Sequence, residues 1–230
     1  MIKAVIFDFN GTMIFDSDFH RRVWFEFIPR YTGRRVTYEE IDKNMLGRDN
    51  ASILRKYFGE HISEQKIEEL TQEKEAAYRR LCLANKERFV LVDGVVEFLD
   101  YLKEKGMPTT IATGSEISNL KFYYEHFELW RWFDFDRIVY DDGSFPGKPA
   151  PDIYLRAAAA LKTEPADCLV FEDAHSGVLA AHNAGIGYIV AVSETEDASF
   201  FDSAGGVDLV TKNFLGYTRF LELEPKGNHA

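Results

Sequence analysis

The sequence predicts an α/β protein in which a doubly wound parallel sheet carries an all-helical insertion after its first strand. Short apolar runs bounded by turn or charged residues alternate with segments of helical periodicity along most of the chain. Runs of this kind are typical of strands buried on both faces, and their alternation with helices favours a parallel sheet. Between residues 15 and 90 the alternation stops, and helical patterns follow one another without a strand.

Five apolar runs are the expected strands of this sheet, and they cover residues 4–9, 109–113, 136–140, 168–173 and 187–192. Helices are expected in the intervening segments, over residues 95–102, 153–161 and 178–184. The first and last of these helices are followed by glycine, which commonly ends a helix. Because ligands bind at the carboxyl ends of the strands in such sheets, we expect the site at three residues that end strands: Asp8, Thr113 and Asp173.

The segment from residue 15 to residue 90 is predicted to fold as a separate helical domain. Its first helix is indicated by large apolar residues at four-residue spacing: Phe19, Val23, Phe27 and Tyr31. The sequence TYEE at residues 37–40 resembles a capping box, and Ser63 is placed to cap a long charged helix. The expected domains are therefore a core of residues 1–14 and 91–230 and a helical domain of residues 15–90.

Composition and charge argue against several classes of protein. The chain has 230 residues, of which 46% are hydrophobic, so it can bury a sizeable core. Its formal net charge of −11 and the lack of a Lys/Arg cluster argue against binding to nucleic acid or to an anionic membrane. The sequence has no apolar stretch of about 18 residues and no signal-peptide pattern after Met1. We therefore expect a cytoplasmic monomer.

Asp8 is the first candidate catalytic residue, because it follows the first predicted strand and precedes the turn residues Gly11 and Thr12. A carboxylate in this position can attack phosphorus and form an aspartyl phosphate, which divides one difficult transfer into two easier ones. The competing interpretation is structural, since Asp at a strand end commonly caps a turn. The residue alone does not distinguish between the two.

The segment ATGSE at residues 112–116 is a candidate phosphate-binding motif. A predicted strand runs into Thr113, Gly114 and Ser115 at the expected start of a helix. Hydroxyl groups and backbone N–H groups at such a position suit the oxygens of a phosphoryl group. In isolation, the same pattern is more typical of a helix N-cap.

Lys148 is the candidate cation of the site. It lies in FPGKPAPDIY at residues 145–154, where three prolines stiffen the loop and restrict the position of the ammonium group. Most lysines are solvated surface residues, but a lysine in a proline-rich loop directly before a helix is less typical of a surface. The loop therefore presents a fixed positive charge that suits a phosphate.

Glu172 and Asp173 close an apolar predicted strand in FEDAHSG at residues 171–177. Two acids are unfavourable at the end of a buried strand unless they pair with a cation. A hard divalent ion with oxygen ligands fits best, and Mg2+ is the expected cofactor. The alternative is that both acids cap the following turn.

The motifs DFNGT, TGS, GKPAPDIY and EDAHSG occur in the order of the haloacid dehalogenase superfamily, which the chain resembles from Ala4 to about Ala191. The resemblance implies a Rossmann-like core, and the insertion resembles the cap of the subgroup with a helical cap domain. The segment HRRVW places His20 and Trp24 where the beta-phosphoglucomutase-like branch carries a His and a Trp.

The resemblance also implies roles for the candidate residues and a small phosphorylated metabolite as the partner. The nucleophile of the family matches Asp8. The phosphoryl oxygens are held by residues that match Thr113, Gly114 and Lys148. Mg2+ is bound by groups that match Asp8, Asp173 with the help of Glu172, and the backbone carbonyl of Asn10.

Asn10 departs from the family pattern, in which this position holds an Asp that protonates the leaving oxygen and then activates the attacking water or hydroxyl. An amide keeps the size and the hydrogen-bonding capacity of Asp but transfers no proton. General acid/base catalysis is typically worth about 100-fold to 10,000-fold in rate. We therefore expect an intact binding site and impaired turnover.

Four explanations of Asn10 are open. It is an engineered change that traps a bound state, or it is native and the imidazole of His20 takes over as the base. Alternatively, the protein is phosphonatase-like and uses a lysine of the helical domain, or it binds a phosphometabolite without turnover. For His20, the competing interpretation is a polar contact between the helical domain and the core. Against the phosphonatase, none of the following lysines is expected in an apolar setting that lowers its pKa: Lys43, Lys56, Lys66, Lys74 and Lys86.

The loop around Gly47 carries Leu46 where a true beta-phosphoglucomutase carries a Lys, and this departure favours a phosphatase over a mutase of bisphosphorylated sugars. Arg48 and Asn50 are its candidate substrate-facing residues, or else surface residues without a ligand. The expected function is a Mg2+-dependent phosphatase that acts on a small, sugar-like phosphate ester through an aspartyl phosphate. The alternatives are a catalytically silent phosphometabolite-binding protein and a beta-phosphoglucomutase-like phosphomutase.

Overall fold

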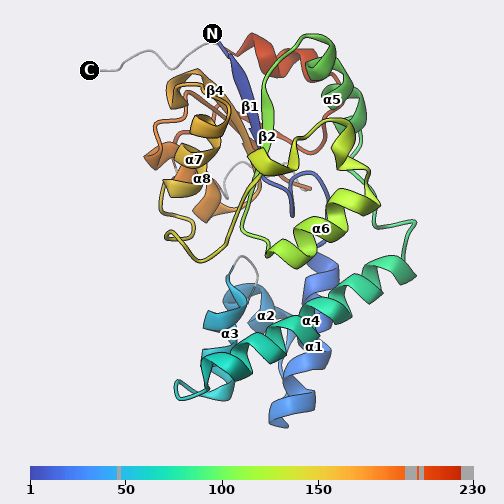
Figure 1. The fold of residues 1–230 in the computed structure, drawn as a ribbon. Helices are drawn as coiled ribbons and strands as arrows, with labels where there is room; N and C mark the ends of the chain where they lie inside the picture. The colour runs from blue at the N-terminus through green and yellow to red at the C-terminus, as the bar shows by residue number, and fades with distance from the viewer. Residues whose placement is uncertain (46–47, 195–200, 202–204, 224–230) are drawn as a thin grey trace. The chain divides into compact units, whose positions relative to one another are not determined.

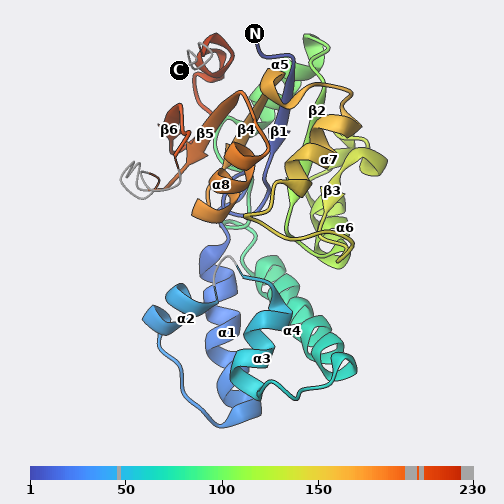
Figure 2. The same cartoon turned by 90° about the vertical axis from the view of Figure 1, so that its left-hand side faces the viewer.

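The computed structural model describes residues 1–45, 48–194, 201 and 205–223 (Figures 1 and 2). The chain divides into two compact units. One, the core unit, contains Met1–Phe15 and Leu91–Ala230, and the other, the helical unit, contains Asp16–Val90. None of the described helices combines the length and the apolar character that a membrane-spanning segment needs.

A six-stranded parallel sheet forms the centre of the core unit and confirms the predicted α/β class. Its strand order is β3-β2-β1-β4-β5-β6. The strands are β1 (Ala4–Phe7), β2 (Thr109–Thr113), β3 (Val139–Tyr140), β4 (Cys168–Glu172), β5 (Tyr188–Val192) and β6 (Leu209–Thr211). Along the chain, β2 and β3 are added on one side of β1, and β4, β5 and β6 are then added on its other side. The switch point, where doubly wound folds bind their ligands, therefore lies between β1 and β4.

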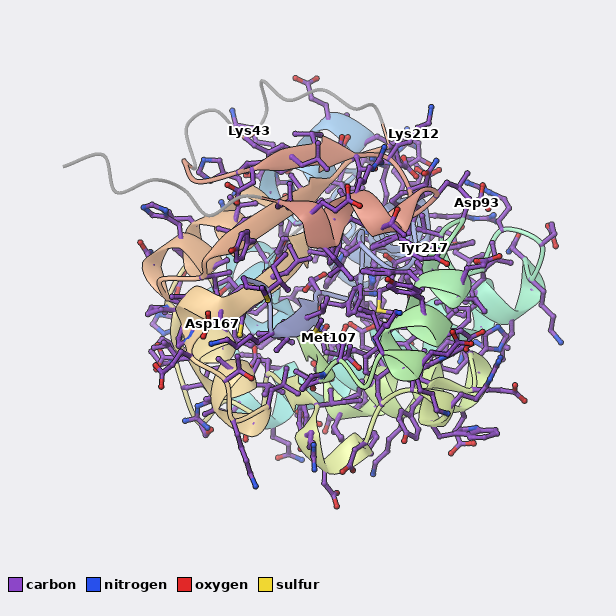
Figure 3. The ribbon with its side chains drawn as sticks, turned by 90° about the horizontal axis from the view of Figure 1, so that it is seen from above. Lys43, Asp93, Met107, Asp167, Lys212 and Tyr217 are labelled. Carbon is purple, nitrogen blue, oxygen red and sulfur yellow. The ribbon has the colours of Figure 1, made fainter. Side chains whose placement is uncertain are left out.

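Helices cover both faces of this sheet, and Figure 3 looks onto the edge where Met107 and Asp167 precede β2 and β4. The predictions of three helices are confirmed, whereas only the start of α6 was predicted, and β6 was not predicted. Residues 136 and 137, expected in a strand, belong to a 3-10 helix, so β3 keeps two residues. The helices are α5 (Val95–Glu104), α6 (Ile117–His126), α7 (Asp152–Ala160) and α8 (His175–Asn183), with the 3-10 helices η1 (Leu129–Arg131), η2 (Phe135–Arg137), η3 (Pro165–Asp167) and η5 (Tyr217–Glu222).

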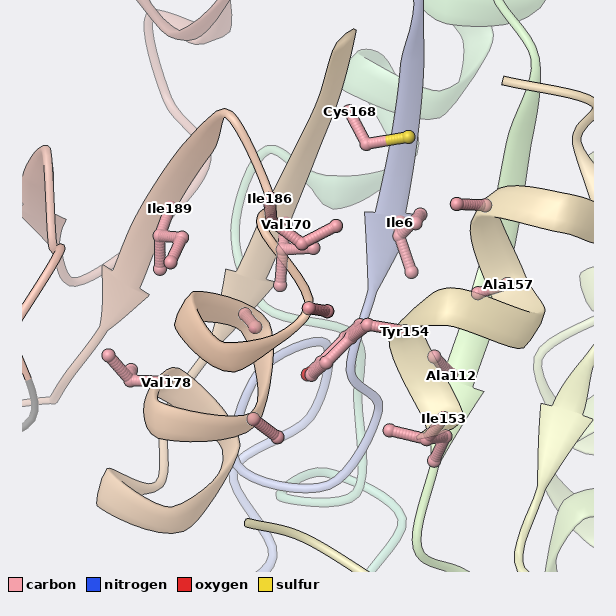
Figure 4. Packing of buried hydrophobic residues seen from close by; sticks show 14 of the residues in the cluster. Ile6, Ala112, Ile153, Tyr154, Ala157, Cys168, Val170, Val178, Ile186 and Ile189 are labelled. Atoms are coloured by element: carbon pink, nitrogen blue, oxygen red, sulfur yellow. The ribbon is translucent and has the colours of Figure 1, made fainter. Parts of the chain in front are cut away.

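One face of the sheet packs against α7 and α8 (Figure 4). The helices contribute small buried residues such as Ala157 and Ala181, and the strands contribute branched residues such as Ile6 and Val170. Small side chains let a helix approach the sheet closely, and branched ones fill the space between them. Because α8 starts directly after β4, this packing holds the first turn of α8 at the carboxyl edge of the sheet.

The other face carries a cluster of aromatic rings. Phe7 of β1 stacks on Phe171 of β4 with 5.2 Å between ring centroids, and both rings contact Phe98 of α5 and Phe214. All four side chains are fully buried. Such rings bury large apolar areas and pack in defined relative orientations. The two central strands therefore form a rigid base for the residues that follow them.

Backbone pairing joins the two segments of the core unit that flank the helical unit in sequence. Ile14 forms an antiparallel bridge with Leu91. The N–H group of Val92 donates to the carbonyl oxygen of Met13 at 2.9 Å. The two ends of the inserted segment are therefore held next to each other within the core unit.

The helical unit consists of α1 (Ser17–Thr32), α2 (Tyr38–Asn44), α3 (Asn50–Phe58) and α4 (Glu64–Ala84). Both predicted caps are confirmed, since Thr37 Oγ1 accepts from the N–H of Glu40 at 3.1 Å and Ser63 Oγ accepts from the N–H of Lys66 at 3.2 Å. These hydroxyls satisfy backbone donors that have no partner inside the helix. The apolar faces of the helices meet in a separate core that includes Trp24, Ile28, Ile41, Leu54 and Leu70.

Candidate active site

Three carboxylates meet at the carboxyl ends of β1 and β4, the two strands at the switch point of the sheet. Asp8 directly follows β1, Glu172 ends β4, and Asp173 is the next residue. One oxygen atom from each residue lies within 4.8 Å of the other two. Asp8 is 5% exposed and Glu172 is fully buried, so water solvates these charges poorly. A buried group of like charges needs a cation to stabilise it.

Lys148 supplies a cation from within the chain. Its Nζ donates hydrogen bonds to Asp8 Oδ1 at 2.6 Å and to Glu172 Oε1. Burial disfavours the charged ammonium, but the carboxylates of Asp8 and Glu172 outweigh burial and hold the pKa of Lys148 well above its usual value. A charged lysine therefore lies beside the candidate nucleophile.

Tyr154, on α7, completes this arrangement and was not singled out from the sequence. Its hydroxyl donates to Glu172 Oε1 at 3.0 Å, so this oxygen accepts from both Tyr154 and Lys148. Burial and then the carboxylate of Glu172 raise the pKa of Tyr154 well above its usual value, and the phenol stays protonated. Tyr154 is the last residue of GKPAPDIY, but a sequence does not reveal whether a tyrosine is used for its ring or for its hydroxyl.

The loop after β1 lies directly against Asp173. Thr12 Oγ1 donates to Asp173 Oδ1 at 3.3 Å. Gly11 has a φ of 81°, and a Cβ atom there would lie 2.0 Å from Asp173 Oδ2. Two features therefore favour glycine at position 11. The backbone is in the left-handed region, and the carboxylate of Asp173 occupies the space that a Cβ atom would need.

The side chain of Asn10 is held on both sides within the core unit. Ser115 Oγ donates to Asn10 Oδ1 at 2.5 Å, and Asn10 Nδ2 donates to the hydroxyl oxygen of Tyr123 at 2.9 Å. Tyr123 lies on α6, is fully buried and stacks on Phe9 with 4.6 Å between centroids. Tyr123 was not singled out from the sequence, because only the start of α6 was expected and an aromatic residue in a helix does not reveal that its hydroxyl bonds to a residue of another segment.

The residues of ATGSE have different surroundings. Thr113 is buried at the end of β2, and its Oγ1 accepts from the N–H of Ser115 at 3.0 Å, as a turn-capping hydroxyl does. Gly114 has open space around its Cα, since a Cβ there would meet nothing within 4 Å. The helix begins at Ile117, later than expected. The segment thus brings Ser115 to Asn10 and leaves the backbone at Gly114 accessible to a ligand.

His20 contacts other residues of the helical unit through both ring nitrogens. Nε2 lies 3.3 Å from Asp16 Oδ2, and Nδ1 lies 3.0 Å from Lys74 Nζ. Because an ammonium group only donates, Nδ1 is the acceptor and Nε2 carries the proton toward Asp16. The ring also stacks on Tyr78 with 4.1 Å between centroids. These contacts agree with a structural role for the imidazole, within the helical unit itself.

The expectation that no lysine of the helical unit lies in an apolar setting that lowers its pKa stays a prediction, but one of these lysines, Lys74, is buried. Its side chain is 3% exposed, and its Nζ lies 5.1 Å from the ring centroid of Trp24. Nζ donates to Glu75 Oε1 at 2.7 Å, so a buried carboxylate lies directly beside this amino group. The burial was missed because QEKEAAY has the composition of an exposed charged helix.

The remaining candidates of the helical unit are Arg48 and Asn50. Arg48 is exposed, and Asn50, the first residue of α3, donates through Nδ2 to Glu75 Oε1 at 2.7 Å. The nearby positions 46 and 47, on which the comparison with phosphoglucomutases depends, lie outside the described residues. Substrate-facing roles for Arg48 and Asn50 stay predictions.

Glu75→Gln is expected to lower the free energy of unfolding by about 3 to 5 kcal/mol, because it leaves the ammonium of Lys74 buried without an opposite charge. Burial favours the neutral acid, but the charge of Lys74 and the hydrogen bonds from Lys74 and Asn50 outweigh it and lower the pKa of Glu75 to about 2. A carboxyl whose folded-state pKa lies below its ordinary 4.5 stabilises the fold above about pH 4.5, and this contribution disappears as the pH falls toward 2.

Urea unfolding between pH 2 and pH 7 measures both effects of this substitution. The control is Glu69→Gln, which removes an exposed partner of Lys66 on the same helix and is expected to change stability by less than about 1 kcal/mol. Equal small losses in the two variants would contradict a stabilising role for the buried pair.

The comparisons with known proteins agree with this fold. Residues 2–185 match the family of haloacid dehalogenase-like hydrolases. The match covers most of the chain, and the chain therefore belongs to this family of hydrolytic enzymes. The resemblance inferred from the four sequence motifs is confirmed.

Three similar proteins illustrate the family. The protein CbbY of Rhodobacter capsulatus is 29% identical over 208 residues, which are 88% of this chain and 91% of the relative. Fructose-1-phosphate phosphatase YqaB of Escherichia coli is 30% identical over 183 residues, which are 80% and 93% of the two chains. A crystal structure of a family IA, variant 3 hydrolase from Entamoeba histolytica is 34% identical, covers 93% of this chain and 94% of its own, and has a TM-score of 0.84. Such relatives support a phosphatase or phosphomutase role.

Proposed function

We propose that this chain is a Mg2+-dependent phosphatase that hydrolyses a small, sugar-like phosphate ester through an aspartyl phosphate on Asp8. The observation that carries the proposal is the meeting of three carboxylates with Lys148 at the ends of β1 and β4. A buried carboxylate beside a fixed cation suits the transfer of a phosphoryl group to that carboxylate. The name of the relative fructose-1-phosphate phosphatase supports a sugar-like substrate.

Asp8, Asp173 and the backbone carbonyl of Asn10 are the proposed ligands of Mg2+. Hard cations prefer carboxylate and carbonyl oxygens, and the close approach of the acids suits such an ion. When bound, the ion neutralises charge on the phosphoryl oxygens. Glu172 is better suited to support the site than to bind the ion directly, because its two oxygens already accept from Lys148, Tyr154 and the N–H of Ala174.

In the proposed reaction, an oxygen atom of Asp8 attacks phosphorus while the bond between phosphorus and the ester oxygen breaks. Water then attacks the aspartyl phosphate, releases inorganic phosphate and restores the carboxylate of Asp8. Lys148 and the backbone at Gly114 bind the phosphoryl oxygens in both steps, and Thr113 supports them from the end of β2. The leaving oxygen must gain a proton and the water must lose one, but Asn10 transfers no proton. Turnover by this chain is therefore expected to be slow.

A phosphometabolite-binding protein without turnover is the second candidate. The observation in its favour is the ordered amide of Asn10, held by Ser115 and Tyr123 where the family pattern has a proton-transferring carboxylate. A beta-phosphoglucomutase-like phosphomutase is the third candidate, and Leu46 argues against it because a mutase of the branch carries a Lys there.

Calorimetric titration with Mg2+ tests the proposed metal site. Asp173→Ala is expected to weaken Mg2+ binding by at least about 10-fold, because it removes an anionic oxygen ligand. The control is Glu104→Ala, which removes an exposed acid of α5 and is expected to leave the affinity unchanged. Equal affinity in Asp173→Ala and the unsubstituted chain would refute the assignment.

A further inference from the structure

We propose that Tyr154 is a positioning residue, whose hydroxyl directs the ammonium of Lys148 toward Asp8 and thereby sets the affinity of the site for phosphate. The inference rests on the proposed function of this site. It assigns the hydroxyl of Tyr154, as distinct from its ring, to the binding of the phosphoryl group. Tyr154 acts through Glu172 and Lys148 and does not itself touch the substrate.

The first observation is that Tyr154 and Lys148 share one acceptor. The Tyr154 ring extends from α7 toward α8 (Figure 4), and its hydroxyl reaches Glu172 Oε1 at 3.0 Å. The same oxygen accepts from Lys148 Nζ, which lies 5.3 Å from the centroid of the Tyr154 ring. Tyr154 is fully buried, so water does not compete for this hydrogen bond.

The second observation is that the carboxylate of Glu172 is fixed in place. Its Oε2 accepts from the N–H of Ala174 at 2.7 Å. Gly177 of α8 lies against its other side, where a Cβ atom would approach Oε1 to 1.7 Å. Glu172 therefore does not rotate to meet its donors, and the position of Lys148 depends on which donors share Oε1.

The sharing of Oε1 determines where the ammonium lies. A carboxylate oxygen has two lone pairs, and an ammonium has three N–H donors. With the Tyr154 hydroxyl on Oε1, the attraction of Glu172 for Lys148 is partly satisfied, and Nζ lies 2.6 Å from Asp8 Oδ1. Without the hydroxyl, Oε1 is available to Lys148 alone, and the ammonium is drawn away from Asp8. A phosphoryl group on or beside Asp8 then loses part of its cation.

Tyr154→Phe isolates the hydroxyl, because the ring keeps its place in the apolar cluster with Ile153 and Ala157. Calorimetric titration with inorganic phosphate in saturating Mg2+ is expected to show a Kd about 10-fold higher than that of the unsubstituted chain, since hydrogen bonds to charged groups are the strong ones. Tyr124→Phe is the matched control. It removes a tyrosine hydroxyl that donates to the carbonyl of Phe133, also in the core unit, and is expected to leave the Kd unchanged.

A double-mutant cycle tests whether the effect passes through Glu172. In a Glu172→Gln background, Tyr154→Phe is expected to cause no further change in the Kd for phosphate, because the shared anionic oxygen is gone. An equal 10-fold loss in that background would overturn the proposal, as would an unchanged Kd in Tyr154→Phe alone. If Tyr124→Phe raises the Kd for phosphate as much as Tyr154→Phe does, the proposal is also overturned. The weaker binding would then come from lower stability of the whole core unit.

A crystal structure of Tyr154→Phe tests the positioning role of Tyr154 independently of the proposed function. The distance between Lys148 Nζ and Asp8 Oδ1 is expected to increase beyond hydrogen-bonding range, above about 3.2 Å. An unchanged distance would refute the positioning role even if the chain proves to be a phosphatase. If the unsubstituted chain binds no phosphate, the proposed function fails, and the position of Lys148 in the variant still decides the role of Tyr154.

Discussion

Asn10→Asp is expected to raise kcat for the hydrolysis of a phosphate ester by about 100-fold to 10,000-fold, which corresponds to about 3 to 5 kcal/mol of transition-state stabilisation. The carboxylate restores the group that protonates the leaving oxygen and then takes a proton from the attacking water. The side chains that hold Asn10 accommodate the change, because the hydroxyls of Ser115 and Tyr123 can both donate to a carboxylate. Steady-state hydrolysis of a panel of sugar phosphates in Mg2+, including fructose 1-phosphate, measures the gain.

The matched control for this substitution is Asn213→Asp. It adds the same charge to the core unit and keeps the hydrogen bond that the side-chain oxygen of Asn213 accepts from the N–H of Leu215 at 3.1 Å. Its expected effect on kcat is nil. Intact-mass analysis must precede the assay, because Asn10 precedes Gly11 and such a pair is prone to deamidation, which would create the restored carboxylate in part of the sample. No turnover in either form, with tight binding of a phosphate ester retained, would establish the binding protein instead.

Asp8→Asn is expected to abolish hydrolysis, with a loss of at least about 1,000-fold in kcat, both in the chain as it stands and in combination with Asn10→Asp. The amide does not attack phosphorus, so no aspartyl phosphate forms. Lys148 keeps Glu172 as its anionic partner, and the variant is therefore expected to fold. Rapid-quench measurement of the phosphorylated protein should detect the intermediate in the Asn10→Asp chain and none in the double variant.

Asp100→Asn serves as the control for Asp8→Asn. It neutralises another acid of the core unit while keeping the acceptor for the indole N–H of Trp132, which lies 2.6 Å from Asp100 Oδ1. If Asp8→Asn hydrolyses the ester at the parent's rate, the nucleophile is another residue, because an amide at position 8 does not attack phosphorus. A comparable loss in Asp100→Asn would attribute the effect to the change in charge.

The sheet could be predicted because its central strands are buried on both faces. A strand such as β4 has five buried residues in succession, and such a run is visible in the sequence without a partner. The carboxylates that end β1 and β4 could be placed together for the same reason, since parallel neighbours end at one edge. In contrast, β6 has three residues and α6 mixes buried residues such as Leu120 and Tyr123 with many polar ones, so neither gave a clear periodic signal.

The contacts that support the site could not be predicted, because they join residues that are far apart in sequence. Asn10 and Tyr123 are separated by 113 positions, and their hydrogen bond depends on the packing of α6 against the loop after β1. The buried pair of Lys74 and Glu75 was hidden for a different reason. Neighbouring charges in a helix usually face water, and only the surrounding aromatic side chains show that these two do not.

The bridge between Ile14 and Leu91 pairs the two segments of the core unit that flank the helical unit, so this pairing does not depend on which chain segment lies between them. A chain segment that leaves a fold and returns to a hydrogen-bonded neighbour imposes a closure entropy that grows only slowly with its length. The core therefore tolerates an insert of almost any size at this point, and a turn of a few residues across the bridge would close it as well. Sequence changes between Asp16 and Val90 are thus limited by the helical unit's own core and buried ion pair, and they leave the strand pairing of the core unit untouched.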